Sequence, residues 1–323
     1  MALVLNQREL YQHAVSHEYI IPAFNCFDIE SMRAIVMAAE EEDSPVVLQV
    51  CMAMHNKVHP LGKFVSYIKD YLADAEAPVL LNHDHMQKIE DCMEAVDMGF
   101  PSVMFDGSHL LFEENVEKTK KVVEYAHANG RWVEAELGSI PGFEDIIFNS
   151  KSIYTNPEQA AEFIERTGCD SLSVAVGTAH GGVRANGPLE MDFTLLKEIK
   201  RAAGATPLVL HGAASLPKEY IDEVNAYGGT VEYLSMCLET TIEKSRHYGV
   251  AKANMDVDNF LKYTYTLRKF FTEHSDQFNP FDYNTLASSA MKEACAHKMR
   301  YVTKSAGFGT GFICGMRGED KWV

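Results

Sequence analysis

Residues 82–86 read Asn-His-Asp-His-Met and directly follow the apolar run 77–81. Imidazole rings and carboxylates bind divalent metals and carry protons, so three consecutive residues here combine both kinds of chemistry. The simpler explanation is a polar turn that contains two histidines by chance. Other stretches of the chain decide between the two, because a metal site needs ligands from several segments.

Eight short apolar segments alternate with stretches of helical spacing. The segments are 20–24, 45–50, 78–81, 102–105, 131–135, 171–176, 207–210 and 250–253. Strands that alternate with helices predict right-handed βαβ units and a parallel sheet. Eight such units favour a closed TIM (β/α)8 barrel over an open doubly wound sheet. We therefore expect an α/β protein whose residues 1–323 form a single barrel domain.

Helices are also expected outside the eight units. An extra N-terminal helix is predicted over 3–15, and another over 284–301, within a C-terminal helical extension spanning 284–323. Asp28 and the pair Asn156-Pro157 are of the types that begin helices, since a side-chain oxygen caps the first amides and proline suits the first turn.

In a TIM barrel the chemistry lies at the carboxyl ends of the strands. The residues found there are Asn25, Cys51, Asp84 with His85, Asp106, Glu136, His180, His211, and Asn254 with Asp256. Three histidines beside carboxylates have the composition of a catalytic zinc site with an open position. Taken singly, each histidine is explained by burial with a hydrogen bond, and each carboxylate by a turn or cap. Their combination at strand ends favours the metal site.

Small residues follow two of these histidines. Residues 180–182 read His-Gly-Gly and residues 211–215 read His-Gly-Ala-Ala-Ser. Backbone amides in such loops can surround an oxyanion or a phosphate, and Arg184 could add charge. A tight turn that needs glycine is the alternative. The thiol of Cys51 is expected to pack rather than react, because no neighbouring base is evident.

Composition excludes several classes of partner. The formal net charge of −17 makes nucleic acid and anionic membrane surfaces unsuitable partners. No apolar run reaches the roughly 18–20 residues that a membrane helix needs. The seven cysteines form no Cys-x-x-Cys pattern, so a reduced, cytoplasmic setting is favoured over a disulfide scaffold.

Seven stretches carry a resemblance to a known family. They are PAFN at 22–25, DH at 84–85, SVMFDGSHLLFEENV at 102–116, VEAELG at 133–138, GTAHGG at 177–182, LVLHGAAS at 208–215 and AKANMDVD at 251–258. In this order and spacing the chain resembles the class II, zinc-dependent ketose-bisphosphate aldolases, which include fructose- and tagatose-bisphosphate aldolases. The resemblance covers roughly residues 19–283. It implies a cytoplasmic lyase of carbohydrate metabolism, such as glycolysis, that acts on a sugar phosphate and forms a homodimer or homotetramer.

The resemblance also implies roles for individual residues. It makes His85, His180 and His211 zinc ligands, with Asp84 transferring the C4 hydroxyl proton and Glu144 acting at C3. Asp106 and Glu136 match acidic positions near the metal that can hold a second divalent or a monovalent cation. The implied substrate-binding residues are Asn25, Gly181, Arg184, Gly212, Ser215, Asn254 and Asp256.

The chain departs from the family pattern mainly where phosphate is bound. Cys51, Ala214 and Val257 stand where the family has hydroxyl side chains, and Phe260 where it often has an arginine. A hydrogen bond to a charged group contributes roughly 1.5–3 kcal/mol, so the loss of these groups lowers the expected affinity for a bisphosphate. Fructose 1,6-bisphosphate, cleaved to dihydroxyacetone phosphate and an aldehyde, is the default substrate. A ketose with one phosphate or none is the alternative.

Two other classes of function remain open from the residues alone. His83 and His85 imitate the paired histidines of amidohydrolase-type metal hydrolases, although they follow the third strand rather than the first. A barrel that only binds sugar, without catalysis, is the second.

Overall fold

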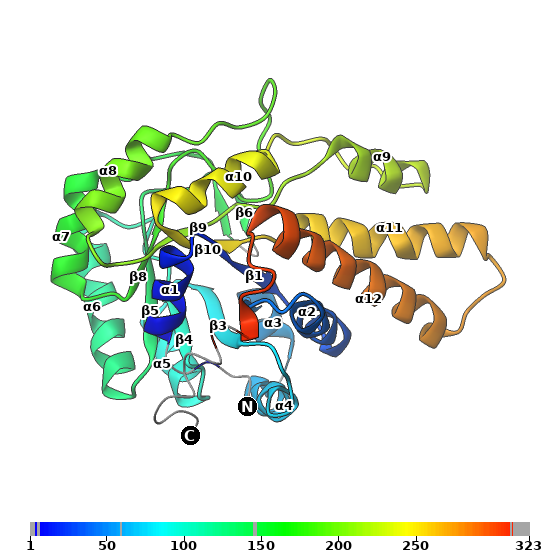
Figure 1. The fold of residues 1–323 in the computed structure, drawn as a ribbon, viewed down its shortest axis with the longest axis horizontal. Helices are drawn as coiled ribbons and strands as arrows, with labels where there is room; N and C mark the ends of the chain where they lie inside the picture. Colours follow the sequence, from blue (N-terminus) through cyan, green and yellow to red (C-terminus); the bar gives the residue numbers. More distant parts are fainter. Residues whose placement is uncertain (1–3, 5–6, 59, 145–146, 311, 313–323) are drawn as a thin grey trace.

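The computed structural model describes residues 4, 7–58, 60–144, 147–310 and 312, the side chains of 144 and 147 excepted. Eight parallel strands close into a barrel in the order β1-β10-β9-β8-β5-β4-β3-β2 (Figure 1). The strands are β1 (Ile21–Asn25), β2 (Val46–Val50), β3 (Val79–Met86), β4 (Ser102–Phe105), β5 (Trp132–Leu137), β8 (Ser171–Val174), β9 (Leu208–Leu210) and β10 (Val250–Asn254). The predicted TIM barrel is confirmed.

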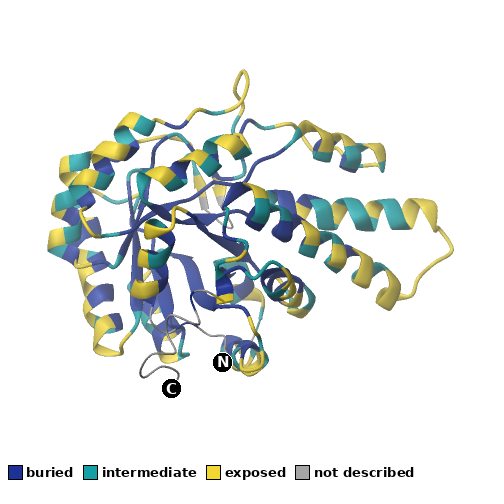
Figure 2. Cartoon of the chain, viewed as in Figure 1, coloured by how far each residue is buried: buried dark blue, intermediate teal, exposed yellow. Residues whose placement is uncertain are grey.

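Helices surround the barrel with their apolar sides turned inward (Figures 1 and 2). They are α2 (Ile29–Glu41), α3 (Met52–Lys57), α4 (Leu61–Leu72), α5 (Ile89–Asp97), α6 (Phe112–Ala128), α7 (Pro157–Thr167), α8 (Phe193–Ala203), α9 (Lys218–Ala226) and α10 (Glu239–Ser245), followed by the 3-10 turn η1 (Arg246–Tyr248). Asp28 caps α2 through the amide of Ser31, and Asn156 caps α7 with Pro157 in its first turn. Both predicted helix starts are confirmed.

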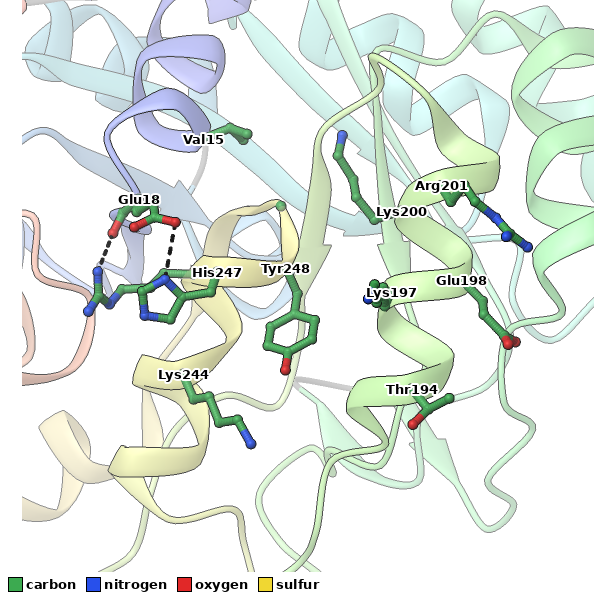
Figure 3. A pocket seen from close by; sticks show the side chains of 12 residues that line it. Val15, Glu18, Thr194, Lys197, Glu198, Lys200, Arg201, Lys244, His247 and Tyr248 are labelled. Atoms are coloured by element: carbon green, nitrogen blue, oxygen red, sulfur yellow. Dashed lines mark hydrogen bonds and ion pairs between the residues drawn. The ribbon is translucent and has the colours of Figure 1, made fainter.

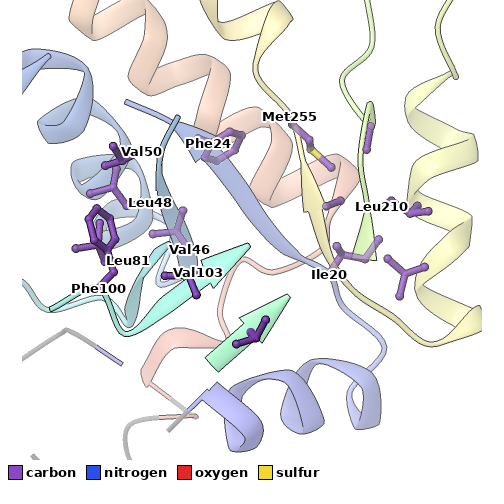
Figure 4. Packing of buried hydrophobic residues seen from close by; sticks show 14 of the residues in the cluster. Ile20, Phe24, Val46, Leu48, Val50, Leu81, Phe100, Val103, Leu210 and Met255 are labelled. Carbon is purple, nitrogen blue, oxygen red and sulfur yellow. The ribbon is translucent and has the colours of Figure 1, made fainter. Parts of the chain in front are cut away.

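The core lies between the strands and this helical layer. Apolar residues with little exposed surface pack from neighbouring strands onto the helices, including Phe24, Leu48, Leu81 and Leu210 (Figure 4). The strand sequences are nearly continuous apolar runs because both faces of a barrel strand are covered. Transfer of such side chains from water supplies the main driving force for closing the barrel.

The amino-terminal end of the barrel is closed by α1 (Gln7–Ser16). Leu10 and Tyr11 of this helix belong to the same buried cluster as Val47, Leu80 and Val209 from the strands. The helix was predicted over 3–15; residues 3, 5 and 6 of that range lie outside the described part of the chain. Closure at this end leaves the opposite, carboxyl end as the open mouth.

A long helical hairpin, α11 (Val257–Glu273) and α12 (Pro280–His297), projects from the barrel (Figure 1). The predicted final helix over 284–301 begins earlier, at Pro280, because the Asn279 side chain caps it. It continues as a π-helical turn, η2 (Lys298–Val302). No helix among the described residues is long and apolar enough to span a membrane.

The structure corrects the expected strand ends at several places. β3 continues to Met86, so Asp84 and His85 lie within a strand rather than after it. β5 likewise continues past Glu136 to Leu137. A short hairpin of β6 (Gly142–Glu144) and β7 (Ile147–Asn149), which the sequence did not predict, lies between β5 and α7. The strand ends were predicted too early because polar residues end the apolar run at the mouth, whereas the backbone pairing of the strands continues past them.

Candidate active site

Three histidines from separate segments meet at the mouth of the barrel. One ring nitrogen each of His85, His180 and His211 lies within 4.8 Å of the others. Nε2 of His85 is 2.8 Å from Nδ1 of His211, and the His180 ring centre is 5.2 Å from that of His85. All three side chains are buried. The structure thus brings together the three histidines that the sequence singled out.

The backbone of His85 is strained in a way that serves this convergence. Its φ is +45°, in the left-handed region that a non-glycine residue rarely adopts, and the pairing of β3 with β4 shifts register between His83 and Met86. Consecutive side chains of a regular strand point to opposite faces. Here Asp84 and His85 reach the same centre, with Oδ2 of Asp84 3.8 Å from Nε2 of His85. Strain held by the surrounding fold is common at functional sites.

The chemistry of the three rings fits a divalent cation. Nε2 of His180 is buried and has no hydrogen-bond partner among the described residues. Burial and the neighbouring His85 lower the pKa of both His180 and His211, so these rings are neutral and offer lone pairs. One shared proton can join His85 to His211 but leaves His180 unsatisfied. A metal ion ligated by all three rings satisfies every nitrogen at once.

Two ligand candidates are oriented by carboxylates behind them. Nδ1 of His85 lies 3.1 Å from Oδ2 of Asp106, and Nε2 of His211 lies 2.9 Å from Oε1 of Glu134. Carboxylates in these positions fix the tautomer and direct the other nitrogen of each ring toward the shared centre, where a metal would bind. Glu134 and its buried partner Lys252 were missed by the sequence reasoning. The period-two spacing of Glu134 and Glu136 in VEAELG was the available signal, since it places both inside the barrel.

Asp106 and Glu136 lie close to the histidines, and their pKa values are shifted in opposite directions. Burial alone would raise the pKa of Asp106, but hydrogen bonds from His85 and Ser108 outweigh it, and that pKa lies below its usual value. Burial and the charge of Asp106 raise the pKa of Glu136 to about 8. Oε2 of Glu136 is 3.4 Å from Nδ1 of His211. Two carboxyl groups close together beside three imidazole rings are suited to a cation.

Asp84 is fully buried and held by amide donors. Its Oδ2 accepts hydrogen bonds from Nε2 of Gln49 at 2.7 Å and Nδ2 of Asn254 at 3.0 Å, and Asn82 donates to Oδ1 at 3.3 Å. Such donors stabilise the charged carboxylate and fix its direction. Gln49 was not predicted, although a lone glutamine in the apolar strand VVLQV was a visible signal.

A second polar cluster joins β1 to the end of β10. The amide nitrogen and Nδ2 of Asn25 donate to the carboxylate of Asp256, at 2.6 and 2.9 Å. Nε2 of Gln49 is 3.4 Å from Oδ1 of Asn25, which links this cluster to Asp84. One side of the mouth, next to the Asp84 carboxylate, is therefore lined by three of the predicted substrate contacts: Asn25, Asn254 and Asp256.

The glycines after the two later histidines adopt left-handed backbone, with φ of +64° at Gly181 and +59° at Gly212. A Cβ atom on Gly212 would lie 2.5 Å from the backbone of Ala179 and 2.9 Å from the amide nitrogen of His180. Gly212 is thus required for the close approach of two neighbouring loops. At Gly181 the nearest atom would be the carbonyl oxygen of Phe143, at 3.2 Å.

Other predicted residues are engaged elsewhere. Arg184 is exposed and forms a two-pronged ion pair with Glu232, with both distances 2.7 Å. Oγ of Ser215 is 3.3 Å from Oε1 of Glu239 and accepts from Lys298 at 2.9 Å. The structure therefore does not bring Arg184 to the histidines in this conformation, and it ties up the Ser215 hydroxyl.

The remaining candidates have simple positions. Cys51 precedes α3 as its N-terminal cap residue. Nε2 of His83 lies 2.9 Å from Nδ1 of His55, and burial together with His55 lowers the pKa of His83 to about 3. His83 is not among the clustered histidines, which removes the paired-histidine motif of a metal hydrolase. Glu144 falls in β6, but its side chain lies outside the described part of the structure.

A closed parallel barrel with histidines and carboxylates gathered at the carboxyl ends of its strands defines a TIM-barrel protein with an enzyme-type site. Residues 5–307 match the model of a family described as fructose-bisphosphate aldolase class-II. The chain belongs to this family and is a class II aldolase, a carbon–carbon lyase.

Individual relatives agree over nearly the whole length. The fructose-bisphosphate aldolase of Treponema pallidum is 36% identical over 322 residues, covering 94% of this chain and 97% of that protein. The fructose-bisphosphate aldolase of Thermus caldophilus is 38% identical over 294 residues, covering 90% and 95%. Among solved structures, the YdjI aldolase of Escherichia coli K12 is similar with a TM-score of 0.73 at 29% identity, covering 94% of this chain and 98% of that one.

Proposed function

We propose that this protein is a zinc-dependent aldolase that cleaves a ketose phosphate, by default fructose 1,6-bisphosphate, to dihydroxyacetone phosphate and an aldehyde. The observation that carries the proposal is the convergence of His85, His180 and His211 with the Asp84 carboxylate beside them. The relatives in Treponema and Thermus are named for the same substrate.

Zinc is proposed because three neutral imidazoles are its usual catalytic ligand set, with a fourth position left for substrate. Oxygen-rich sites suit magnesium or calcium instead. Asp106 and Glu136 are proposed to help hold a second divalent or a monovalent cation, because their carboxylates lie against His85 and His211 respectively. When bound, the metal would act as a Lewis acid that withdraws charge from the ketose oxygens.

The protein's own residues would handle the protons. Asp84, fixed by Gln49 and Asn254, would accept the proton of the C4 hydroxyl as the C3–C4 bond breaks. Glu144 would return a proton at C3, in keeping with its position in the β6–β7 hairpin beside the mouth, where Gly142 pairs with His180. Asn25 and Asp256 would bind the hydroxyl groups of the sugar. The amides of Gly181 and Gly212 would bind phosphate.

A ketose with a single phosphate, or with none, is the second candidate substrate. One observation favours it: Arg184 is paired with Glu232, and the Ser215 hydroxyl is already bonded to Glu239 and Lys298. Both residues would have to exchange these partners to bind phosphate. Such an exchange costs part of the roughly 1.5–3 kcal/mol that each charged hydrogen bond supplies.

One assay separates these proposals. Ketose bisphosphates, monophosphates and free ketoses are tested for aldehyde release, with metal content measured before and after chelation. Loss of activity with the chelator, and its return with zinc, is expected. Activity that survives complete metal removal would contradict the zinc mechanism, and the preferred substrate of the panel distinguishes the bisphosphate from the alternatives. We also propose a cytoplasmic homodimer or homotetramer, to be checked by light scattering of the purified protein.

A further inference from the structure

A cavity of about 990 Å³ lies on the outside of the barrel, between α8 and the α10–η1 segment (Figure 3). Its lining includes Gly249, the residue before β10, Glu18, shortly before β1, and residues of α8 from Thr194 to Arg201. It therefore opens near the amino-terminal end of the barrel, away from the histidines. In Figure 3 Lys244 and Tyr248 lie on one side of the cavity and Lys197 on the other.

The charge of this cavity is opposite to that of the molecule. The chain has 46 acidic against 29 basic residues. The lysines and arginines that line the cavity are Lys197, Lys200, Arg201, Lys244 and Arg246, against the acidic residues Glu18 and Glu198. Arg246 is itself paired with Glu243 at 2.9 Å. Glu18 is paired with His247 at 3.2 Å, and both Glu198 and Arg201 point away from the cavity in Figure 3, so Lys197, Lys200 and Lys244 supply its positive charge. A positive hollow on a strongly acidic protein attracts anions selectively.

Three lysines in this cavity have no carboxylate partner among the described residues. Nζ of Lys200 donates to the carbonyls of Gly204 and Thr206, and its stem lies against Gly249. Nζ of Lys244 lies 4.2 Å from the centre of the Phe193 ring. Lys197 is exposed and forms no hydrogen bond or ion pair with the described residues. Carbonyls and a ring orient an ammonium without cancelling its charge, so these lysines remain available to an anion.

An apolar pocket of about 370 Å³ adjoins the cavity. The two share Val15 and Lys200 in their linings. The apolar pocket is also lined by Tyr11, Trp132 and Pro207, and the Tyr11 and Trp132 rings are stacked with centres 5.3 Å apart. Tyr11 is 1% and Trp132 8% exposed, and the Arg8 guanidinium lies 5.6 Å from the Trp132 ring centre, so a flat apolar group in this pocket would lie beside the two rings rather than between them.

We propose that the joined pockets bind a nucleotide, with its phosphates among Lys197, Lys200 and Lys244 and its base in the pocket beside Trp132. A cationic hollow next to an aromatic one matches the two halves of such a ligand, and a single inorganic phosphate would fill only a small part of the space. The site is independent of the proposed catalytic function, because none of its lining residues belongs to the histidine centre.

Tryptophan fluorescence tests the site in the whole, metal-loaded protein. The chain has two tryptophans, so a Trp322→Phe background leaves Trp132 as the reporter. Magnesium-ATP is expected to change Trp132 emission with a Kd below about 1 mM, and tripolyphosphate or adenosine should bind about tenfold more weakly or worse. The double variant Lys197→Glu/Lys244→Glu should lose about tenfold or more in ATP affinity. Lys120→Glu on exposed α6 is the control, since it changes the net charge without touching the cavity.

A second variant tests the aromatic half. Ala205 lines the apolar pocket and is exposed, so Ala205→Leu fills space without disturbing the core. This change should lower the affinity for ATP by about fivefold or more and leave the affinity for tripolyphosphate within about twofold of the parent value. The proposal is overturned if ATP does not bind, if the double lysine variant binds ATP as the parent does, or if tripolyphosphate binds as tightly as ATP. Unchanged metal content in each variant shows that the barrel is intact.

Discussion

Nζ of Lys252 lies 2.9 Å from Oε2 of Glu134 inside the barrel, and each side chain is about 1% exposed. Oε1 of the same glutamate is 2.9 Å from Nε2 of His211. A buried cation thus compensates the carboxylate that orients one of the proposed zinc ligands. Placing a charge in the interior is costly unless a partner neutralises it, so this pair connects the stability of the barrel to the geometry of its mouth.

Lys252→Met should destabilise the fold by about 3–5 kcal/mol, because it leaves Glu134 charged and buried without its partner. Urea unfolding measures the change. The control is Lys218→Met, which breaks the exposed pair with Asp222, where the side chains are 68% and 58% exposed. That change should cost only about 0–1 kcal/mol. Equal effects in the two variants would show that the interior pair carries no special weight.

Asp84→Ala should keep the metal and lose the reaction. Asp84 contacts amide donors and is proposed as the proton acceptor, so kcat should fall by about 10²–10⁴ while metal content stays near that of the parent. Asp106→Ala should instead weaken metal binding, because Oδ2 of Asp106 orients His85 from 3.1 Å. Its metal affinity should fall by about 10–100-fold. Metal analysis and initial rates distinguish the two, and near-normal turnover of Asp84→Ala would remove its assigned role.

The sequence predicted the strands, and it singled out the three histidines that the structure brings together, because both signals are local. Apolar runs of four to six residues reveal barrel strands whatever their partners are. The positive φ of His85 and the register shift of β3 could not be predicted, because they depend on pairing with β4. Lys252 was missed for a similar reason. A lysine is expected at the surface, and its compensating partner Glu134 is 118 residues away in the chain.

Gly212→Ala should be more harmful than Gly181→Ala. Both residues have φ near +60°, so the conformational cost of about 1–2 kcal/mol is common to the two. Only at position 212 would the new Cβ meet backbone at 2.5 Å, next to His180. We expect Gly212→Ala to lose metal and activity together, while Gly181→Ala retains metal. Retained metal in both variants would contradict the proposed close approach.

Phe260→Arg should improve binding of substrates with a distal phosphate. Phe260 is 37% exposed on α11 and its ring meets that of Phe27 edge-on, with ring centres 5.6 Å apart, outside the buried core cluster. A new cation near phosphate contributes about 1.5–3 kcal/mol, or roughly a tenfold or larger drop in KM. Phe271→Arg, on the same helix and 46% exposed, adds the same charge farther along. No gain for bisphosphates over free ketoses would show that residue 260 does not face the substrate.

Glu239 makes part of the free energy of unfolding depend on pH in the acidic range. Burial opposes it, but the hydrogen bond from His297 and the charge of Lys298 lower the pKa of Glu239 to about 2. A carboxylate with a depressed pKa stabilises the folded state fully above its unfolded pKa of about 4.3, and this contribution disappears as the pH falls toward the folded value. Glu239→Gln should therefore lower the free energy of unfolding by about 1–2 kcal/mol at neutral pH, a value discounted for partial exposure. Its difference from the parent should shrink as the pH falls from about 4.3 to 2.

Glu243→Gln, which removes one carboxylate from the same helix at its pair with Arg246, is the matched control. A Glu239→Gln difference that stays constant over this range would mean that the carboxylate does not lose its partners by protonation there.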